Sequence, residues 1–520
     1  MNEDTAARTP LAVLAMVVAA AFAFVLAKPG FHAACVSTLG VILFVSSLRL
    51  PLRQEMALRA VLMTFLMPVV AWLLPSVWLL YAVMALWVPV FAGRMERIAG
   101  VYLFSLLLLP ALEMPVELGG LKLFDLGVHD ALALGATFAV LSHPARARIA
   151  PADDIRVGCL LLALVFISAR DTSFTHALRS TINVTIDYGL PYYILSRTLK
   201  DGETMRAAMR WLACAASGLA ILLAYEAWRN WPIYNELYWH LQVPMVLIVK
   251  TRGALLRAGG PFNEPTSIAL VMALCLVALW LLRDDFRSRR RHGLLCLAVF
   301  VGVSAPQSRN AWIALALAVL LGDVFLGRWR ALVRKFAPTA MVLGIVLAAA
   351  SVSPSFSESL GLSGQGSDTA DYRRDLLHRG SEEFWGSPLV GFSGAQLEVR
   401  LEDMRQGEGI IDYVNTYLWF GLFGGAAGLW IFVWNLFAPL SRLWRGRRLA
   451  FASGGAAPAA FVFGCLATLS LALFFASFGN RPSVLMFGFF GFAAAIRALG
   501  RRQAVSPAGA VPWTGAALPA

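Results

Sequence analysis

Long apolar runs recur along the 520-residue chain and are separated by shorter polar stretches. They lack the alternation of apolar and polar residues that the strands of a membrane barrel show. Because hydrocarbon offers backbone amides and carbonyls no water, each run is predicted to be a transmembrane helix. We expect helices at residues 9–27, 31–48, 57–74, 76–93, 97–112, 128–142, 155–169, 182–196, 208–225, 265–282, 293–306, 310–327, 337–353, 415–437, 458–477 and 482–497.

The pattern predicts an all-α fold, a polytopic transmembrane helical bundle of about 12–16 helices with one larger periplasmic loop. That loop contains a helical pattern, DYRRDLLHRGSEEFW, followed by a Pro/Gly break, SPLVGFSG. We divide the chain into N-terminal transmembrane helices (1–225), transmembrane helices with outer-face arginine motifs (226–353), the periplasmic loop (354–414), C-terminal transmembrane helices (415–502) and a disordered cytoplasmic tail (503–520).

Composition supports this class, since 59% of the residues are hydrophobic and only 14% are charged. A soluble protein of this length needs more polar residues to cover its surface. The leader MNEDTAART carries two acids and one arginine, which is a poor start for a signal peptide. The first run is therefore predicted to be a retained helix.

Positive charge sets the predicted orientation, because loops rich in Lys and Arg stay on the cytoplasmic side. With the N-terminus inside, most of the 44 Lys and Arg residues fall in cytoplasmic segments such as RDDFRSRRRH and SRLWRGRR. We expect a multi-pass protein of the bacterial inner membrane with both termini cytoplasmic. The net charge of +13 reflects this topology and attraction to membrane lipid, and no basic soluble surface points to nucleic acid. The cysteines fall in apolar runs and the histidines are scattered, so no metal site is expected.

Some basic residues lie on the predicted outer face, against the usual bias. They form three groups, which are Lys250, Arg252 and Arg257; Arg309; and Arg373, Arg374 and Arg379. The helices that begin near Pro265, Asn310 and Asn415 all point their N-termini, the positive ends of their dipoles, toward this face. Asn263, Ser308 and Asn415 lie near those starts, where short polar side chains satisfy unpaired amides. Helix N-termini beside arginines favour an anion, and the guanidinium fork suits a diphosphate.

These arginines also have simpler interpretations. An outer arginine near a helix end can be an interfacial anchor, and Arg373 and Arg379 can be surface charges of a loop helix. Arg309 is different because it lies in a very short turn, QSRNAW, between two apolar helices. A charge there costs on the order of a few kcal/mol unless it is partnered or hydrated, which favours a functional role.

The same stretches resemble the O-antigen ligase and O-antigen/exopolysaccharide polymerase superfamily of bacterial membrane glycosyltransferases. The motifs are RAGGPFNEPTSIA (257–269), SRNAW (308–312), a long outer loop with SPLVGF (387–392), and GEGIIDYVNTYLWFGLFGG (407–425). Their order is that of the family. The resemblance covers about residues 250–437, whereas the N-terminal half matches mainly in being hydrophobic.

The resemblance implies transfer of a glycan from undecaprenyl diphosphate to an acceptor hydroxyl on the periplasmic face, without cofactor, nucleotide sugar or metal. The acceptor is another lipid-linked repeat unit in a polymerase and lipid A-core in a ligase. Arg257 and Arg309 would hold the diphosphate and stabilise the leaving group. Arg373 or Arg374 would close over it, and Arg252, Glu264 and Asn415 complete the expected substrate-binding set. A flippase and a chain-length regulator of the same pathway are candidate partners.

One departure from the family concerns the general base. Ligase-like members carry a histidine directly before the asparagine of the final motif, and this chain has Val414 there. Asp412, Glu408 and Glu264 are alternative proton acceptors, with Asp412 placed first because it lies near the start of the same helix. Asp412 could equally cap that helix. The missing histidine favours a polymerase over a lipid A-core ligase.

Other functions remain alternatives. A lipid-linked oligosaccharide flippase would place charges in mid-membrane, for which Asp187 and Glu226 are candidates. A metal-dependent glycosyltransferase with acidic motifs in its first outer loop is disfavoured, because that loop, AKPGF, has no carboxylate. A purely structural subunit would not need arginines in a tight outer turn.

Overall fold

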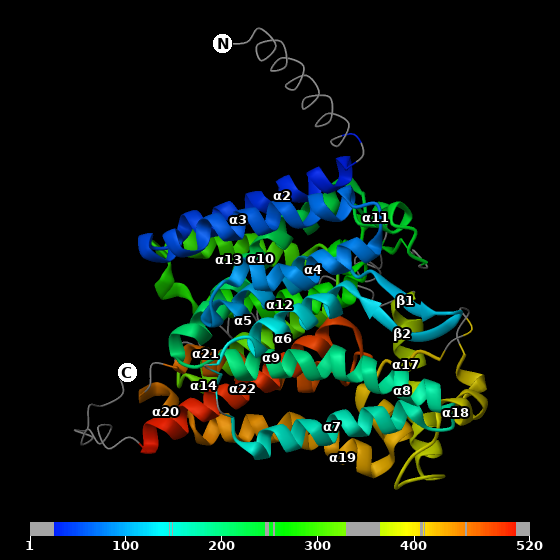
Figure 1. Cartoon of the computed structure of the whole chain (residues 1–520). Coiled ribbons are helices and arrows are strands. Elements are labelled where there is room, and N and C mark those ends of the chain that lie inside the picture. The colour runs from blue at the N-terminus through cyan, green and yellow to red at the C-terminus, as the bar shows by residue number, and fades with distance from the viewer. Residues whose placement is uncertain are drawn as a thin grey trace, which may run out of the picture.

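The computed structural model describes residues 25, 27–144, 146–147, 149–244, 249–252, 255–328, 365–405, 409, 411–452 and 455–505. Most of these residues form helices that lie roughly side by side in one bundle (Figure 1). The predicted helices at 9–27 and 337–353, the start of the long loop and the end of the predicted tail lie largely or wholly outside these ranges. The predicted bounds of the domains stay predictions.

The first part of the bundle contains helices of very different lengths. They are α2 (Lys28–Ser47), α3 (Leu50–Leu73), α4 (Val77–Ala92), α5 (Met95–Leu108), α6 (Val128–Leu141), α7 (Pro151–Ala169), α8 (Phe174–Val184), α9 (Leu190–Thr198), α10 (Gly202–Arg229) and the short α11 (Asn235–His240). Strands β1 (Glu113–Leu118) and β2 (Leu121–Gly127) pair antiparallel between α5 and α6.

The second part begins with a two-residue strand pair, β3 (Thr251–Arg252) and β4 (Leu255–Leu256). The helices that follow are α12 (Pro265–Leu281), α13 (Arg289–Ser304), α14 (Arg309–Phe325), α17 (Gln365–Phe384), α18 (Gly394–Arg400), α19 (Thr416–Arg445), α20 (Arg447–Ala452), α21 (Ala456–Ala472) and α22 (Asn480–Val505). The DYRRDLLHRGSEEFW pattern is thus helical, as predicted, and all of it except the final Trp385 belongs to α17.

Within the described residues, five helices are long and apolar enough to cross a membrane, namely α2, α3, α10, α19 and most of α22. Shorter apolar helices, such as α4, α6, α12 and α21, lie among them. The prediction of an all-α, polytopic helical membrane protein is confirmed. The strands of the described segments form two small two-stranded hairpins.

The connections between helices gather at two opposite ends of the bundle. One end, which we call the loop end, carries β1, β2, α11, α17 and α18 (Figure 1). Contacts there join distant segments, such as Asn310 to the carbonyl of Phe475 at 3.3 Å. The other end, the tail end, carries α20 and the last turns of α22. The connections predicted to be periplasmic are those at the loop end.

Two elements differ from the prediction. The run 182–196 is part of a longer continuous helix, in which α8 and α9 are joined by a π-helical turn at Thr185–Gly189. Such turns insert a residue into the helix and are frequent at functional sites. The hairpin β1–β2 was not predicted, although the sequence carries a signal for it: Met114, Val116 and Leu118 alternate with other residues, and Gly119 and Gly120 form the turn.

Small residues bring several helices into close contact. A β-carbon at Gly135 of α6 would overlap the Ala85 carbonyl of α4, and one at Gly40 of α2 would overlap the Ser217 carbonyl of α10. In lipid, where the hydrophobic effect adds little between helices, such close backbone approach supplies much of the packing energy. These contacts help to hold the bundle that positions the loop end.

We expect Gly135→Ala to destabilise the protein by about 1–3 kcal/mol, because the added methyl group forces α4 and α6 apart. The measurement is the midpoint of thermal unfolding of the purified protein in detergent. Gly158→Ala on α7 is the matched control, since a β-carbon there meets no atom within 4 Å and alanine favours the helix. Equal midpoints for the two variants would show that the α4–α6 contact does not limit stability.

Candidate functional site

The predicted arginines of the loop end meet at the turn between α13 and α14. The Nη1 of Arg252 donates to the carbonyl of Gln307 at 2.9 Å, and the Nε of Arg257 donates to the carbonyl of Pro306 at 3.1 Å. Arg309 follows this turn as the first residue of α14. The strand pair β3–β4 thus holds two arginines against the turn that carries the third.

The charges of these arginines lie close enough to affect one another. Burial lowers the pKa of Arg257, and the charges of Arg252 and Arg309 lower it further, whereas Glu264 opposes the shift. Arg309 also interacts with the charge of Arg373 on α17. We call Arg252, Arg257, Arg309 and Arg373 the arginine cluster, and its mutual repulsion favours binding of an anion.

The two candidate arginines of α17 differ in their surroundings. Arg373 is partly buried, and its Nε has no hydrogen-bond partner among the described residues. The Arg374 side chain is 80% exposed and pairs with Asp371 at 3.6 Å. Of the two, Arg373 is the one that the structure brings to the cluster.

Helix caps at the loop end follow the prediction in part. Asn415 caps α19, since its Oδ1 accepts from the amides of Tyr417 (3.0 Å) and Leu418 (3.1 Å). At α12 the cap is Glu264, which accepts from the amide of Ser267 at 3.2 Å, rather than Asn263. Ser308 occupies the cap position of α14 without a side-chain bond to it.

Asp412 precedes α19 and does not cap it. Its backbone amide donates to the hydroxyl of Tyr372 at 3.2 Å, and its Oδ1 accepts from Ser477 at 3.1 Å. The interpretation of Asp412 as the helix cap is therefore wrong, because Asn415 fills that position. Asp412 instead joins α17 to the connection before α22. The other candidate base of this segment, Glu408, lies outside the described residues.

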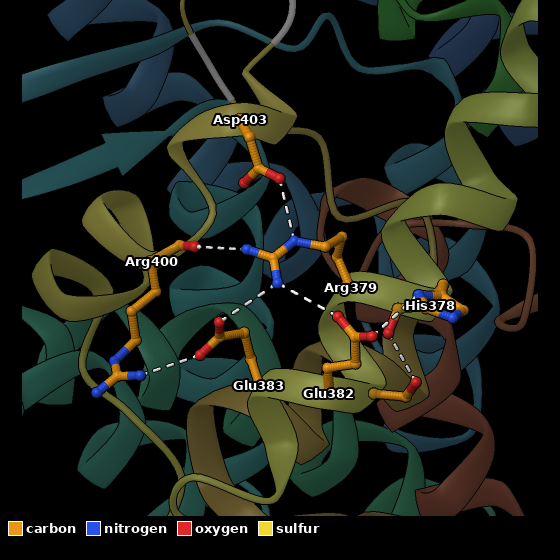
Figure 2. A network of polar contacts seen from close by, with 7 residues as sticks. His378, Arg379, Glu382, Glu383, Arg400 and Asp403 are labelled. Atoms are coloured by element: carbon orange, nitrogen blue, oxygen red, sulfur yellow. Dashed lines mark hydrogen bonds and ion pairs between the residues drawn. The ribbon is translucent and has the colours of Figure 1, made fainter.

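An ion-pair network fixes the position of α17, as Figure 2 shows. The Nε of Arg379 contacts Asp403 at 3.0 Å, and its Nη1 lies 3.3 Å from Glu382. Hydrogen bonds to Asp403 and Glu382 raise the pKa of Arg379. Arg400 pairs with Glu383 at 3.0 Å and lies 4.4 Å over the ring of Phe392. Arg379, part of the third predicted basic group, thus supports the loop and not the cluster.

The segment SPLVGF docks onto a kink in α19. Gly425 has a φ of +61°, and a β-carbon there would overlap the backbone of Leu389, so this position needs glycine. The amide of Phe392 donates to the carbonyl of Leu422 at 2.7 Å. Arg170, just past α7, donates to the carbonyl of Gly391 at 2.6 Å. These contacts explain why the motif and the glycine-rich middle of α19 occur together.

A cavity of ≈ 590 Å³ opens beside the cluster at the loop end. We call it the carboxylate cavity. Its polar lining comes from both halves of the chain and includes Glu113, Asp125, His129, Lys250, Glu264 and Arg481. Burial and the nearby acids Asp125 and Asp130 raise the pKa of Glu113. Lys250 and Asn263 also line a smaller cavity that Arg257 borders, so the two sites are adjacent.

The N-terminal half therefore contributes residues that the sequence did not single out for this site. His129 lies with its Nε2 3.4 Å from Asp130 and 3.7 Å from Asp187, which belongs to the π-helical turn. Among the described residues, these three form the group whose atoms are placed to hold a metal ion, within 4.8 Å of one another. The expectation of no metal stays a prediction. The π-helical turn is a signal that only the structure reveals.

Glu226, the candidate for a mid-membrane charge, supports the backbone near the loop end. It lies near the loop end of α10, is 1% exposed, and accepts from the amides of Gly260 (2.9 Å) and Ile233 (3.2 Å). Gly260 has a φ of +51° and follows Arg257 by three residues. Glu226 thus anchors the loop that carries Arg257.

The fold and this site define a class: a helical membrane protein whose loop end gathers arginines beside a carboxylate-lined cavity. Residues 294–433 match a family model described as O-Antigen ligase. This match supports the resemblance to the O-antigen ligase and polymerase superfamily and covers Arg309, Arg373, Asp412 and Asn415. The Arg257 loop and the N-terminal helices lie outside the matched residues. The chain has no match among curated proteins.

We expect Glu226→Leu to destabilise the loop that holds Arg257, because it leaves two buried amides unpaired at about 1–3 kcal/mol each. Glu226→Gln keeps one carbonyl acceptor and should lose about half as much. Thermal unfolding in detergent measures both effects. Equal stability of Glu226→Leu and the unchanged protein would contradict the anchoring role.

Proposed function

We propose that this protein is a polysaccharide polymerase of the O-antigen polymerase and ligase type. It transfers a glycan from undecaprenyl diphosphate to a hydroxyl of another lipid-linked repeat unit, on the periplasmic face of the inner membrane. The product is an exopolysaccharide or O-antigen. The family match supports the class, and the arginine cluster beside the carboxylate cavity is the observation that carries the proposal.

The arginine cluster suits the diphosphate of the donor. Arg252 and Arg257 each use one donor on the turn before Arg309 and retain further N–H groups. Arg309 lies at the N-terminus of α14, where the helix dipole adds positive potential. Several positive charges held together without an equal number of acids bind a diphosphate strongly and stabilise the additional charge that it gains on leaving.

The reaction breaks the bond between the anomeric carbon of the donor sugar and the diphosphate oxygen. The bond electrons leave with the diphosphate, and the oxygen of the acceptor hydroxyl bonds to the anomeric carbon. The acceptor proton passes to a carboxylate. Carboxylates and amide groups also suit sugar hydroxyls, so the carboxylate cavity is placed to hold a sugar next to the diphosphate.

Glu264 is the proposed base, ahead of Asp412. It lines the carboxylate cavity and lies within electrostatic reach of Arg257. Asp412 has Oδ1 bonded to Ser477 and lies against Tyr372, outside the residues that line this cavity. Asn415 supports the site as the cap of α19.

The alternative functions require particular residues at other positions of the chain. A lipid A-core ligase of this superfamily would carry a histidine where this chain has Val414. A flippase would use charges in mid-membrane, but Asp187 and Glu226 lie beside residues of the loop end, His129 and Gly260. A flippase and a chain-length regulator fit as partners of a polymerase, because lipid-linked units have to be delivered and chain growth stopped.

We expect Arg309→Ala to lower polymer formation by about 100-fold or more, because it removes a group that stabilises the leaving diphosphate. Arg309→Lys should fail as well if bidentate geometry is needed. The measurement is polysaccharide chain length and lipid-linked repeat units in cells, with the level of the protein in membranes determined in parallel.

Arg374→Ala is the matched control for this experiment, because Arg374 is an exposed arginine of α17. Normal polymer in both Arg309 variants would overturn the proposed site. Accumulation of lipid-linked units on the cytoplasmic side would identify a flippase instead.

We expect Glu264→Gln to slow transfer by about 100-fold, the lower range for loss of a general base, while donor binding persists. Glutamine still accepts from the amide of Ser267, so the start of α12 is preserved. Glu117→Gln, an exposed carboxylate of β1, is the control. Loss of transfer in Asp412→Asn together with normal transfer in Glu264→Gln would move the base role to Asp412.

A further inference from the structure

A second charged cavity lies at the tail end, far from the site described above. It has a volume of ≈ 170 Å³ and is bordered by α7, α19, α21 and α22. We call it the tail-end cavity. Arg156 lines it near the start of α7, whereas Arg170, just past the end of this helix, contacts the SPLVGF segment. Fourteen residues of helix separate the two arginines by about 21 Å.

The tail-end cavity has an excess of positive charge. Asp153 is buried and contacts three guanidinium groups, those of Arg442 at 2.6 Å, Arg497 at 2.8 Å and Arg156 at 3.8 Å. Arg501 also lines the cavity. A single carboxylate neutralises one of these charges, so the cavity attracts a further anion.

The buried side chain of Arg156 is the second feature that indicates an anion site. Its side chain is 1% exposed, and its Nε and Nη1 have no hydrogen-bond partner within the described part of the chain. The ring centre of Phe490 lies 6.0 Å from its guanidinium carbon. A buried guanidinium with unpaired donors is costly unless an acceptor reaches it. Arg156 is one of the residues that border the tail-end cavity, so an acceptor bound there lies next to its guanidinium.

The remaining walls of the tail-end cavity are apolar. Leu443, Leu449, Ala493 and Ile496 are among the residues that line it. A free inorganic anion gains nothing from such walls, whereas a lipid places its phosphate on the arginines and an acyl chain along the apolar side. Positive charges between helices at the predicted cytoplasmic face are typical of sites for anionic lipid headgroups.

We propose that the tail-end cavity binds the phosphate group of an anionic phospholipid from the cytoplasmic leaflet. Arg156, Arg442 and Arg497 hold the phosphate oxygens, and Asp153 keeps the three guanidinium groups in place. The bound lipid joins α7 to α19 and α22. These last two helices are far from α7 in the sequence. This site is independent of the proposed transfer reaction at the loop end.

The test uses the full-length protein, purified in detergent and stripped of lipid. Phosphatidylglycerol, phosphatidylcholine with the same acyl chains and inorganic phosphate are each titrated, and the midpoint of thermal unfolding is followed. We expect phosphatidylglycerol alone to raise the midpoint with saturation. In Arg442→Gln the half-saturating concentration should rise about tenfold, as expected for loss of one charged hydrogen bond.

Arg445→Gln is the matched control, because Arg445 lies one turn further along α19, is exposed and does not line the cavity. It should bind phosphatidylglycerol like the unchanged protein. Arg156→Met should also lose binding, and if this variant does not fold, Arg442→Gln decides.

Three results would overturn the proposal. The first is an equal effect of the two lipids, and the second is an equal loss in Arg442→Gln and Arg445→Gln. The third is a full effect of inorganic phosphate alone, which would assign the cavity to a free anion. Unchanged lipid binding in a folded Arg156→Met variant would overturn the proposal as well, because Arg156 would then hold no phosphate oxygen.

Discussion

Hydrocarbon provides no hydrogen-bond partner for backbone polar groups, and this constraint shapes the whole chain. Helices satisfy these groups along their length and leave amides and carbonyls unpaired only at their ends. Polar side chains with a structural or chemical role therefore collect at the ends of the bundle. Asn415 and Glu264 cap helices at the loop end, and the turn before Arg309 receives hydrogen bonds from Arg252 and Arg257.

The arginines at the two ends of the bundle are held by different kinds of acceptor. At the loop end, carbonyl oxygens of one turn accept from two arginines, and the charges of the cluster still repel one another. At the tail end, one buried carboxylate contacts three guanidinium groups. Both arrangements leave positive charge uncompensated, which suits a diphosphate at one end and a phospholipid headgroup at the other.

The long loop depends on two kinds of support. Ion pairs around Arg379 hold α17 against the segment of α18, and backbone contacts dock SPLVGF onto the kink at Gly425. These contacts support the helix that carries Arg373, whose charge interacts with Arg309. The N-terminal half takes part through β1, β2 and His129, which line the carboxylate cavity. Its helices are thus more than a lipid-facing scaffold.

The sequence alone determined the class of fold, the order of most helices and the arginines that meet at the loop end, because hydrophobic runs and charge bias are local properties of the chain. It could not tell that Arg373 faces the cluster while Arg374 is exposed, because that depends on how α17 packs against the bundle. It also left both Asn415 and Asp412 as candidate caps of α19, because either residue suits the start of a helix. The cavity residues Glu113, Asp125 and His129, the π-helical turn at Asp187 and the group around Asp153 appeared only in the structure. These features join segments up to several hundred residues apart, and only packing of the helices brings such segments together.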